Sequence, residues 1–159
     1  MTIQVSTTAS DATVSAAASQ FLSPVVIGLQ ALTINGKQAH WHVRGANFVG
    51  VHELLDTIVE HAGEWADTAA ERIVALGLPV DARLATVADK AKPTAVPAGF
   101  TQSDELVRQV IADVDAVLVE LRAAVDGLGE VDATSQDVAI EIMRGLDKDR
   151  WFLVAHVAE

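Results

Sequence analysis

Apolar and small residues recur along this chain at helical rather than strand-like spacing. Ser23 and Pro24 form a typical N-cap and first-turn pair. After them, one helical face is marked every three or four positions by Val25, Leu29, Leu32, Gly36, His40 and Val43. This spacing places these residues on the same side of an α-helix. The pattern predicts a first long helix over about residues 24–43.

Three further helices and a long connection follow. The next periodic run covers about residues 49–76 and ends at Gly77 and Pro79. The connection after it is too long for a hairpin between neighbouring helices, but it has room for a small helix near residues 82–90. The last two helices are expected over about residues 101–126 and 132–157, each preceded by polar capping residues.

The first 22 residues form a separate region in this interpretation. Residues 1–10 are polar and small, which is typical of a loose tail. The Ala-rich stretch 11–22 either forms a short helix or continues into the first long helix through a kink. Residues 23–159 then form one domain, because a chain of 159 residues is long enough to bury a single core. The expected architecture is all-α, a four-helix bundle with a short helix in the long crossover between helices two and three.

The chain is acidic, with 22 Asp and Glu against 11 Lys and Arg and a formal charge of −11. Such a charge repels phosphate backbones and attracts cations, and residues 1–36 contain no Lys or Arg that could form a basic arm. We therefore expect no direct DNA binding. Because there is no cysteine, nitrogen and oxygen ligands would hold any metal. The absence of a signal peptide and of an uninterrupted apolar span favours a cytoplasmic protein without a membrane segment.

Chemically active side chains concentrate in residues 37–72, where four of the five histidines stand beside a series of carboxylates. On the second helix His52 and Asp56 are four residues apart, as are Asp67 and Glu71, so each pair can bind one ion from one face. All four fall in one stripe about 100° wide, yet Asp56 and Asp67 are about 16 Å apart along the axis. The pairs therefore belong to separate sites, or they meet in a composite site built with an antiparallel second copy.

Two neighbouring residues extend this pattern. His40 would point from the first helix into the bundle near His52, either as a further ligand or as a satisfied core histidine. Gly63 lies in the same stripe near the middle of the second helix and costs about 1 kcal/mol of helix propensity relative to Ala. That cost is explained if two backbones approach closely there, although a tolerated glycine is the simpler interpretation. Carboxylates and imidazoles buried without a cation would carry large desolvation penalties, which favours a metal site over a solvated acidic face.

The chain resembles the Dps family (DNA-binding proteins from starved cells, or mini-ferritins) in four short motifs. These motifs are His40-Trp41, the turn Gly45-Ala46-Asn47-Phe48, His52 with Asp56, and Asp67 with Glu71-Arg72. They occur at the family's spacing and in the family's order of helices, and the resemblance covers about residues 24–159. It implies a ferritin-like four-helix bundle that assembles into a dodecamer.

The resemblance also implies a site and a reaction. His40, His52 and Asp56 of one subunit, with Asp67 and Glu71 of its neighbour, would bind two iron ions at each two-fold interface. This ferroxidase site would oxidise iron(II), preferably with hydrogen peroxide, and iron(III) would be stored as mineral inside the cage, protecting against oxidative damage. Carboxylates and imidazoles suit both oxidation states of iron.

Other interpretations of these residues remain open. Trp41 is either a sacrificial electron donor or a packing residue. The same site could support metal-dependent hydrolysis, since iron with open positions also activates water. A di-iron centre within one subunit, as in ordinary ferritins, is disfavoured because no Glu has a His three residues later.

Acidic residues and the remaining histidines complete the set of candidates. Asp132 and Asp137 resemble the residues that line iron-entry pores in the family, or they are ordinary helix-capping acids. His42, His61 and His156 match no ligand position of the family. They are expected at the surface or in packing.

Overall fold

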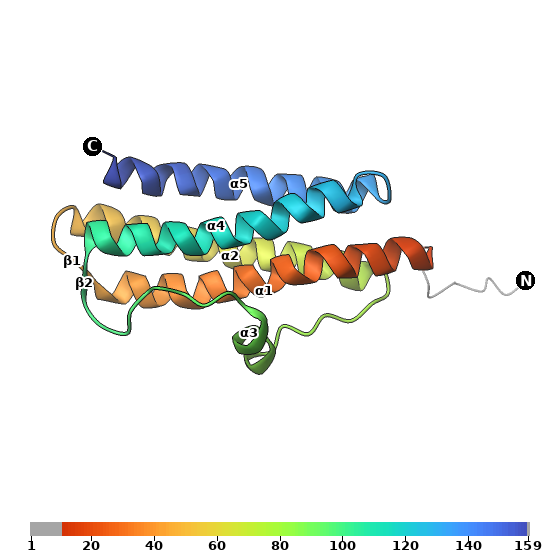
Figure 1. Cartoon of the computed structure of the whole chain (residues 1–159), viewed down its shortest axis with the longest axis horizontal. Coiled ribbons are helices and arrows are strands. Elements are labelled where there is room, and N and C mark those ends of the chain that lie inside the picture. The colour runs from red at the N-terminus through yellow and green to blue at the C-terminus, as the bar shows by residue number, and fades with distance from the viewer. Residues whose placement is uncertain (1–10, 159) are drawn as a thin grey trace, which may run out of the picture.

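The computed structural model describes residues 11–158, which form a four-helix bundle (Figure 1). Its long helices are α1 (Ala12–His42), α2 (Phe48–Ala75), α4 (Ser103–Leu128) and α5 (Ala133–Val157), and the short helix α3 (Leu84–Lys90) lies in the crossover beside α1. Two short strands, β1 (Val43–Arg44) and β2 (Thr101–Gln102), pair in parallel at one end of the bundle. The predicted all-α architecture is confirmed, while the tail predicted over residues 1–10 lies outside the described residues.

The first helix is longer than its sequence pattern predicts. α1 begins at Ala12, where the side chain of Asp11 caps it through a backbone hydrogen bond, and it runs through Pro24 without a break. Of the two possibilities for residues 11–22, continuation into the first long helix is the one observed, so a separate start at Ser23 is wrong and the boundary drawn after residue 22 falls inside a helix. Proline removes one backbone hydrogen bond from a helix. The neighbouring Leu22 is fully buried, however, and packing of this kind holds both halves of α1 against the bundle.

The other helices begin and end within two residues of their predicted positions. Glycines make the turns at both ends of α2. Gly45 has φ of +95°, and a Cβ atom there would lie 2.2 Å from Oε1 of Gln102. Gly77 has φ of +90° and follows the last turn of α2. Both positions adopt the left-handed region that glycine reaches without steric cost.

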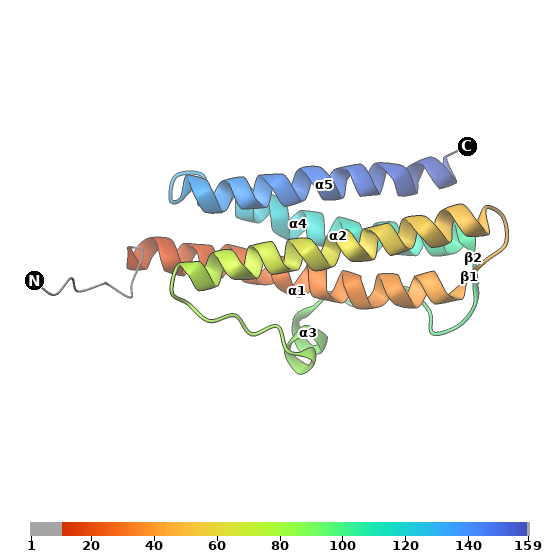
Figure 2. The same ribbon diagram turned by 180° about the vertical axis from the view of Figure 1, so that it is seen from behind.

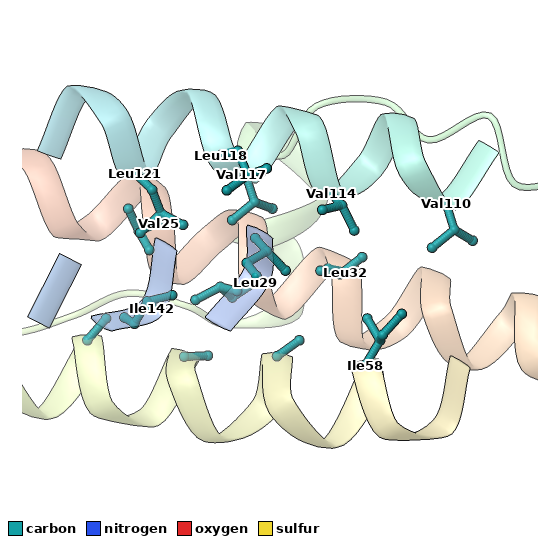
Figure 3. Close-up of a cluster of buried hydrophobic side chains, with 14 of the residues drawn as sticks. Val25, Leu29, Leu32, Ile58, Val110, Val114, Val117, Leu118, Leu121 and Ile142 are labelled. Carbon is teal, nitrogen blue, oxygen red and sulfur yellow. The ribbon is translucent and has the colours of Figure 1, made fainter. Parts of the chain in front are cut away.

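One apolar core fills the bundle. α1 lies against α2 and α4, and α5 packs on α4 and α2 (Figure 2). Figure 3 shows this core from the side, where each labelled residue is at most 3% exposed: Val25, Leu29, Leu32, Ile58, Val110, Val114, Val117, Leu118, Leu121 and Ile142. The helical faces that the sequence pattern marks as apolar are thus the faces that meet in the centre.

α1 is long and apolar enough to cross a membrane, when only length and composition are considered. The core helix of a bundle passes the same test. α1 contributes Leu22, Val25, Leu29 and Leu32 to the common core. Packing therefore accounts for its apolar character.

Candidate metal centre

Two imidazoles form the inner part of the candidate centre, where the end of α1 meets the start of α2. The Nδ1 atom of His40 lies 2.9 Å from the carbonyl oxygen of His52, and Nδ1 of His52 lies 2.9 Å from the carbonyl oxygen of His40. A carbonyl oxygen only accepts, so each Nδ1 carries the proton and donates it. The rings stack at a centroid distance of 3.7 Å. This reciprocal pairing engages both Nδ1 atoms and leaves Nε2 as the nitrogen of each ring that is available to bind a metal.

Asp56 lies beside the imidazoles and is paired with a lysine. Its Oδ1 atom accepts a hydrogen bond from Nζ of Lys37 and lies 3.9 Å from Nδ1 of His40. The hydrogen bond from Lys37 lowers the pKa of Asp56, against a smaller opposing effect of burial. Lys37 has no role in the ligand pattern predicted from the sequence, although it precedes His40 by three residues and so shares its helix face. An ion approaching Asp56 meets a carboxylate that Lys37 already holds.

Asp67 and Glu71 lie on the same helix but away from this group. Both side chains are exposed, and eleven residues separate Asp56 from Asp67, about 16 Å along α2. Within residues 11–158 of the single chain, no three His, Asp or Glu side chains are arranged to hold a metal ion. His40, His52 and Asp56 are thus neighbours that do not form a complete ion site in one chain, and Asp67 and Glu71 lie apart from them.

Two aromatic residues of the sequence motifs, Phe48 and Trp41, are placed differently relative to the imidazole pair. The ring of Phe48 stacks on His52 at a centroid distance of 5.2 Å, so the aromatic that ends the turn motif packs directly on a predicted ligand. Trp41 follows His40 in sequence, but its side chain is 61% exposed. The exposure of Trp41 agrees poorly with a packing role inside one chain, and its role as an electron donor stays a prediction.

Arg72, the last residue of the Asp67 motif, joins the end of α2 to the start of α5. Its Nη2 atom donates to Oδ2 of Asp132 at 2.7 Å, and its Nε atom donates to Oγ of Ser135 at 2.9 Å. Asp132 also caps α5 by accepting from the backbone N–H of Ser135. Burial would raise the pKa of Asp132, but the hydrogen bonds from Ser135 and Arg72 outweigh burial and lower it. Asp132 thus has a capping role, Asp137 is exposed one turn later, and the pore role of both stays a prediction.

The three unassigned histidines lie in different surroundings. His42 bonds back to the carbonyl oxygen of Gln38 in its own helix, and His156 is exposed, as expected of packing and surface residues. His61 instead contacts a buried carboxylate, with 2.8 Å between its Nδ1 atom and Oδ2 of Asp149. Burial raises the pKa of Asp149, and His61 partly offsets this effect. Sequence analysis missed Asp149, although it follows Leu146 by three residues on the buried face of α5.

Comparisons with known proteins place the chain in a family. Residues 29–159 match the ferritin-like domain of the Ferritin family. The DNA protection during starvation protein of Agrobacterium fabrum is 38% identical over 135 residues, which cover 84% of this chain and 82% of that protein. The chain belongs to the Dps family. All five predicted ligands lie within the matched residues.

Solved Dps structures are similar to this chain over almost its whole length. The structure of Dps from Microbacterium arborescens in the high iron form is 65% identical, with a TM-score of 0.93 over 94% of this chain and 98% of that one. A Dps structure from Deinococcus radiodurans is 27% identical, with a TM-score of 0.86 over 91% of this chain and 88% of that one. The bundle described above is therefore the ferritin-like fold of Dps proteins.

Proposed function

We propose that this chain stores iron and detoxifies it as a ferroxidase, at sites shared between two subunits of a dodecameric cage in the cytoplasm. Each site binds two iron(II) ions as substrate. His40, His52 and Asp56 of one subunit face Asp67 and Glu71 of its neighbour. Membership of the Dps family supports iron storage and protection as the general function.

The imidazole pair carries this proposal. His40 is only 8% exposed, and both imidazoles hold their proton on Nδ1 through backbone carbonyls. In the described part of the chain no hydrogen bond occupies Nε2 of either ring. Two oriented nitrogens beside a carboxylate form the neutral and anionic ligands that iron(II) binds. A packing histidine needs no such arrangement of its second nitrogen.

The separation within α2 supports the shared site. Asp67 and Glu71 are exposed and have no partner among the described residues, so they are available to a second copy. A two-fold axis near the middle of α2 would bring them opposite the imidazole pair of the other chain. A Cβ atom at Gly63, near this midpoint, would meet nothing within 4 Å in the single chain. The single chain thus gives no packing reason for this glycine, whereas a close partner helix would.

The proposed reaction is the one that the resemblance to the Dps family implies. Two iron(II) ions lose one electron each, and one hydrogen peroxide takes both electrons and two protons to become two water molecules. No hydroxyl radical is released in this two-electron step. The carboxylates supply negative charge for the iron(III) that forms, which then moves into the cage as mineral.

The remaining parts of the proposal concern access and partners. Asp132 and Asp137 line the path by which iron enters, and Trp41 serves as a sacrificial electron donor. The net charge of −11 disfavours direct binding to DNA. A gel-shift assay at low salt without divalent metal is expected to show no tight binding to duplex DNA.

The main test compares the wild type with an Asp67→Ala, Glu71→Ala variant. Light scattering or native mass spectrometry measures assembly, and absorbance follows iron(II) oxidation by peroxide or by oxygen. We expect an assembled wild type that oxidises iron(II) fastest with peroxide, and a variant that has lost this rate. A wild-type monomer that still oxidises iron rapidly would contradict the shared site. Metal-dependent hydrolysis of amides and esters in the same sample, without peroxide consumption, would favour the hydrolase alternative.

A further inference from the structure

A groove on the side of the bundle away from the imidazole pair has a volume of about 430 Å³. It runs between α1, α4 and the chain that follows α3, and it shares no residue with the candidate metal centre. Small residues on both helices, Gly28, Ala31 and Ala116, line its floor. A Cβ atom at Gly28 would lie 3.2 Å from Val117, so the glycine allows α1 and α4 to approach beneath the groove.

The groove is long and narrow. Its lining on α1 extends from Ser19 to Asn35, about 24 Å along the helix axis. On α4 it extends from Asp113 to Glu120, about 10 Å, and these two residues lie within about 20° of each other around the helix. A linear molecule would fit this shape better than a compact one.

The inner charges of the groove are negative and lack a cation. Asp113 and Glu120 are half-buried, and neither forms an ion pair within residues 11–158. Asp113 accepts a hydrogen bond of 2.6 Å from the hydroxyl of Thr94 and another from Asn35. These neutral donors orient the carboxylate without neutralising it. Burial accordingly raises the pKa of Asp113, which is the behaviour of a carboxylate without a positive partner.

The other charged residues that line the groove are exposed to solvent. Lys90, the last residue of α3, and Lys92 just after it are exposed, and the exposed Asp81 is bound by Arg83. α1 contributes no charged side chain to the lining. Of the charged residues that line the groove, Asp113 and Glu120 are therefore the two that are half-buried, and the small residue Ala116 lies between them on α4.

We propose that this groove binds a linear diamine or polyamine, with one ammonium group at Asp113 and another at Glu120. The methylene chain between the amines covers Gly28 and Ala116. Both ends gain a charge-assisted hydrogen bond, and the apolar middle loses contact with water. An anion would be repelled by the two carboxylates, and a lone divalent cation would contact one end and leave the apolar floor empty.

The test is calorimetric titration of the full-length, metal-free protein with spermidine at constant ionic strength, with hexylamine and magnesium chloride as comparison ligands. We expect spermidine to bind one site per chain and hexylamine to bind at least about tenfold more weakly. Asp113→Asn keeps the size of the side chain and its acceptor for Thr94, and Glu120→Gln is its counterpart. Each is expected to weaken spermidine about tenfold.

Two further variants complete the test. Glu141→Gln on α5 removes one exposed carboxylate outside the groove and should leave spermidine affinity unchanged. Ala116→Met fills the groove without changing charge and should weaken spermidine as well. The proposal is wrong if spermidine does not bind, if magnesium competes as well as spermidine at equal ionic strength, or if Glu141→Gln weakens binding as much as Asp113→Asn. Because no iron is present, this result is independent of the ferroxidase proposal.

Discussion

A complementation experiment tests whether the two ligand groups on α2 act in the same site. One variant, His52→Ala with Asp56→Ala, lacks the inner group. The other variant, Asp67→Ala with Glu71→Ala, lacks the outer pair. If every site takes its two groups from different chains, each variant alone has no complete site and is inactive. A mixture of the two variants regains activity.

The geometry determines how much activity returns. Random mixing of equal amounts makes about half of all two-fold pairs mixed. In a mixed pair, one site combines both defects and the other combines both intact groups. The mixture should therefore show about one quarter of the wild-type rate per chain, since half of the pairs carry one of two sites. A site contained within one chain would give no recovery, because no chain holds both groups.

The assay is peroxide-dependent iron(II) oxidation, followed by absorbance, on variants that are mixed unfolded and refolded together. Native mass spectrometry first verifies that mixed assemblies are present. A matched control, Asp104→Ala with Glu105→Ala, removes the same two residue types from the exposed first turn of α4 and should keep the full rate. The shared site is refuted if verified mixed assemblies stay inactive. Substantial activity in either variant alone would instead indicate two independent sites.

Four further predictions follow from particular contacts. Lys37→Met removes the competitor for Asp56 and should lower the iron(II) concentration for half-maximal oxidation about two- to fivefold in rate assays. Gly63→Leu should leave the single chain folded by circular dichroism, since nothing lies within 4 Å, but should reduce the assembled mass in light scattering. Gly145→Ala places a Cβ atom 2.3 Å from a tryptophan ring and should cost about 1–3 kcal/mol in denaturant unfolding. The pKa of Asp149 is raised, so the folded chain binds the proton of this carboxyl group more tightly than the unfolded chain does. The free energy of unfolding should therefore fall as pH rises from the ordinary pKa of 3.8 through the raised pKa. Asp149→Asn should remove this part of the pH dependence, which denaturant unfolding at several pH values measures.

Most of the fold could be predicted because each helix carries its own boundaries and its own apolar face. α4 is the clearest case, with acidic residues in its first turn and buried residues at three- and four-residue steps. α1 is the exception, because the local preference of Ser23 and Pro24 for a helix start was outweighed by burial on both sides of the proline. Burial of that kind depends on α2 and α4, which no local pattern of α1 contains.

The candidate site also combines features that spacing within one helix predicts with features that depend on contacts between helices. Spacing on α2 was enough to separate His52 and Asp56 from Asp67 and Glu71, because helix geometry alone fixes that distance. The contact between His40 and His52 depends on how α1 and α2 are joined. The sequence predicted only that His40 lies near His52. The role of Lys37 was missed because its partner is 19 residues away on another helix. Cross-helix contacts of single polar groups leave no periodic pattern to detect.

Charge compensation connects this geometry to assembly. In the single chain, Lys37 offsets the charge of Asp56. Asp67 and Glu71 are exposed, so water solvates them. In the proposed assembly a second chain covers these two carboxylates, so they lose that water and require positive charge. Lys37 already binds Asp56 and supplies this charge only in part. Iron(II) bound at the interface provides the missing charge, so iron should bind the assembled form more tightly than separated chains, and by linkage it should stabilise the two-fold contact.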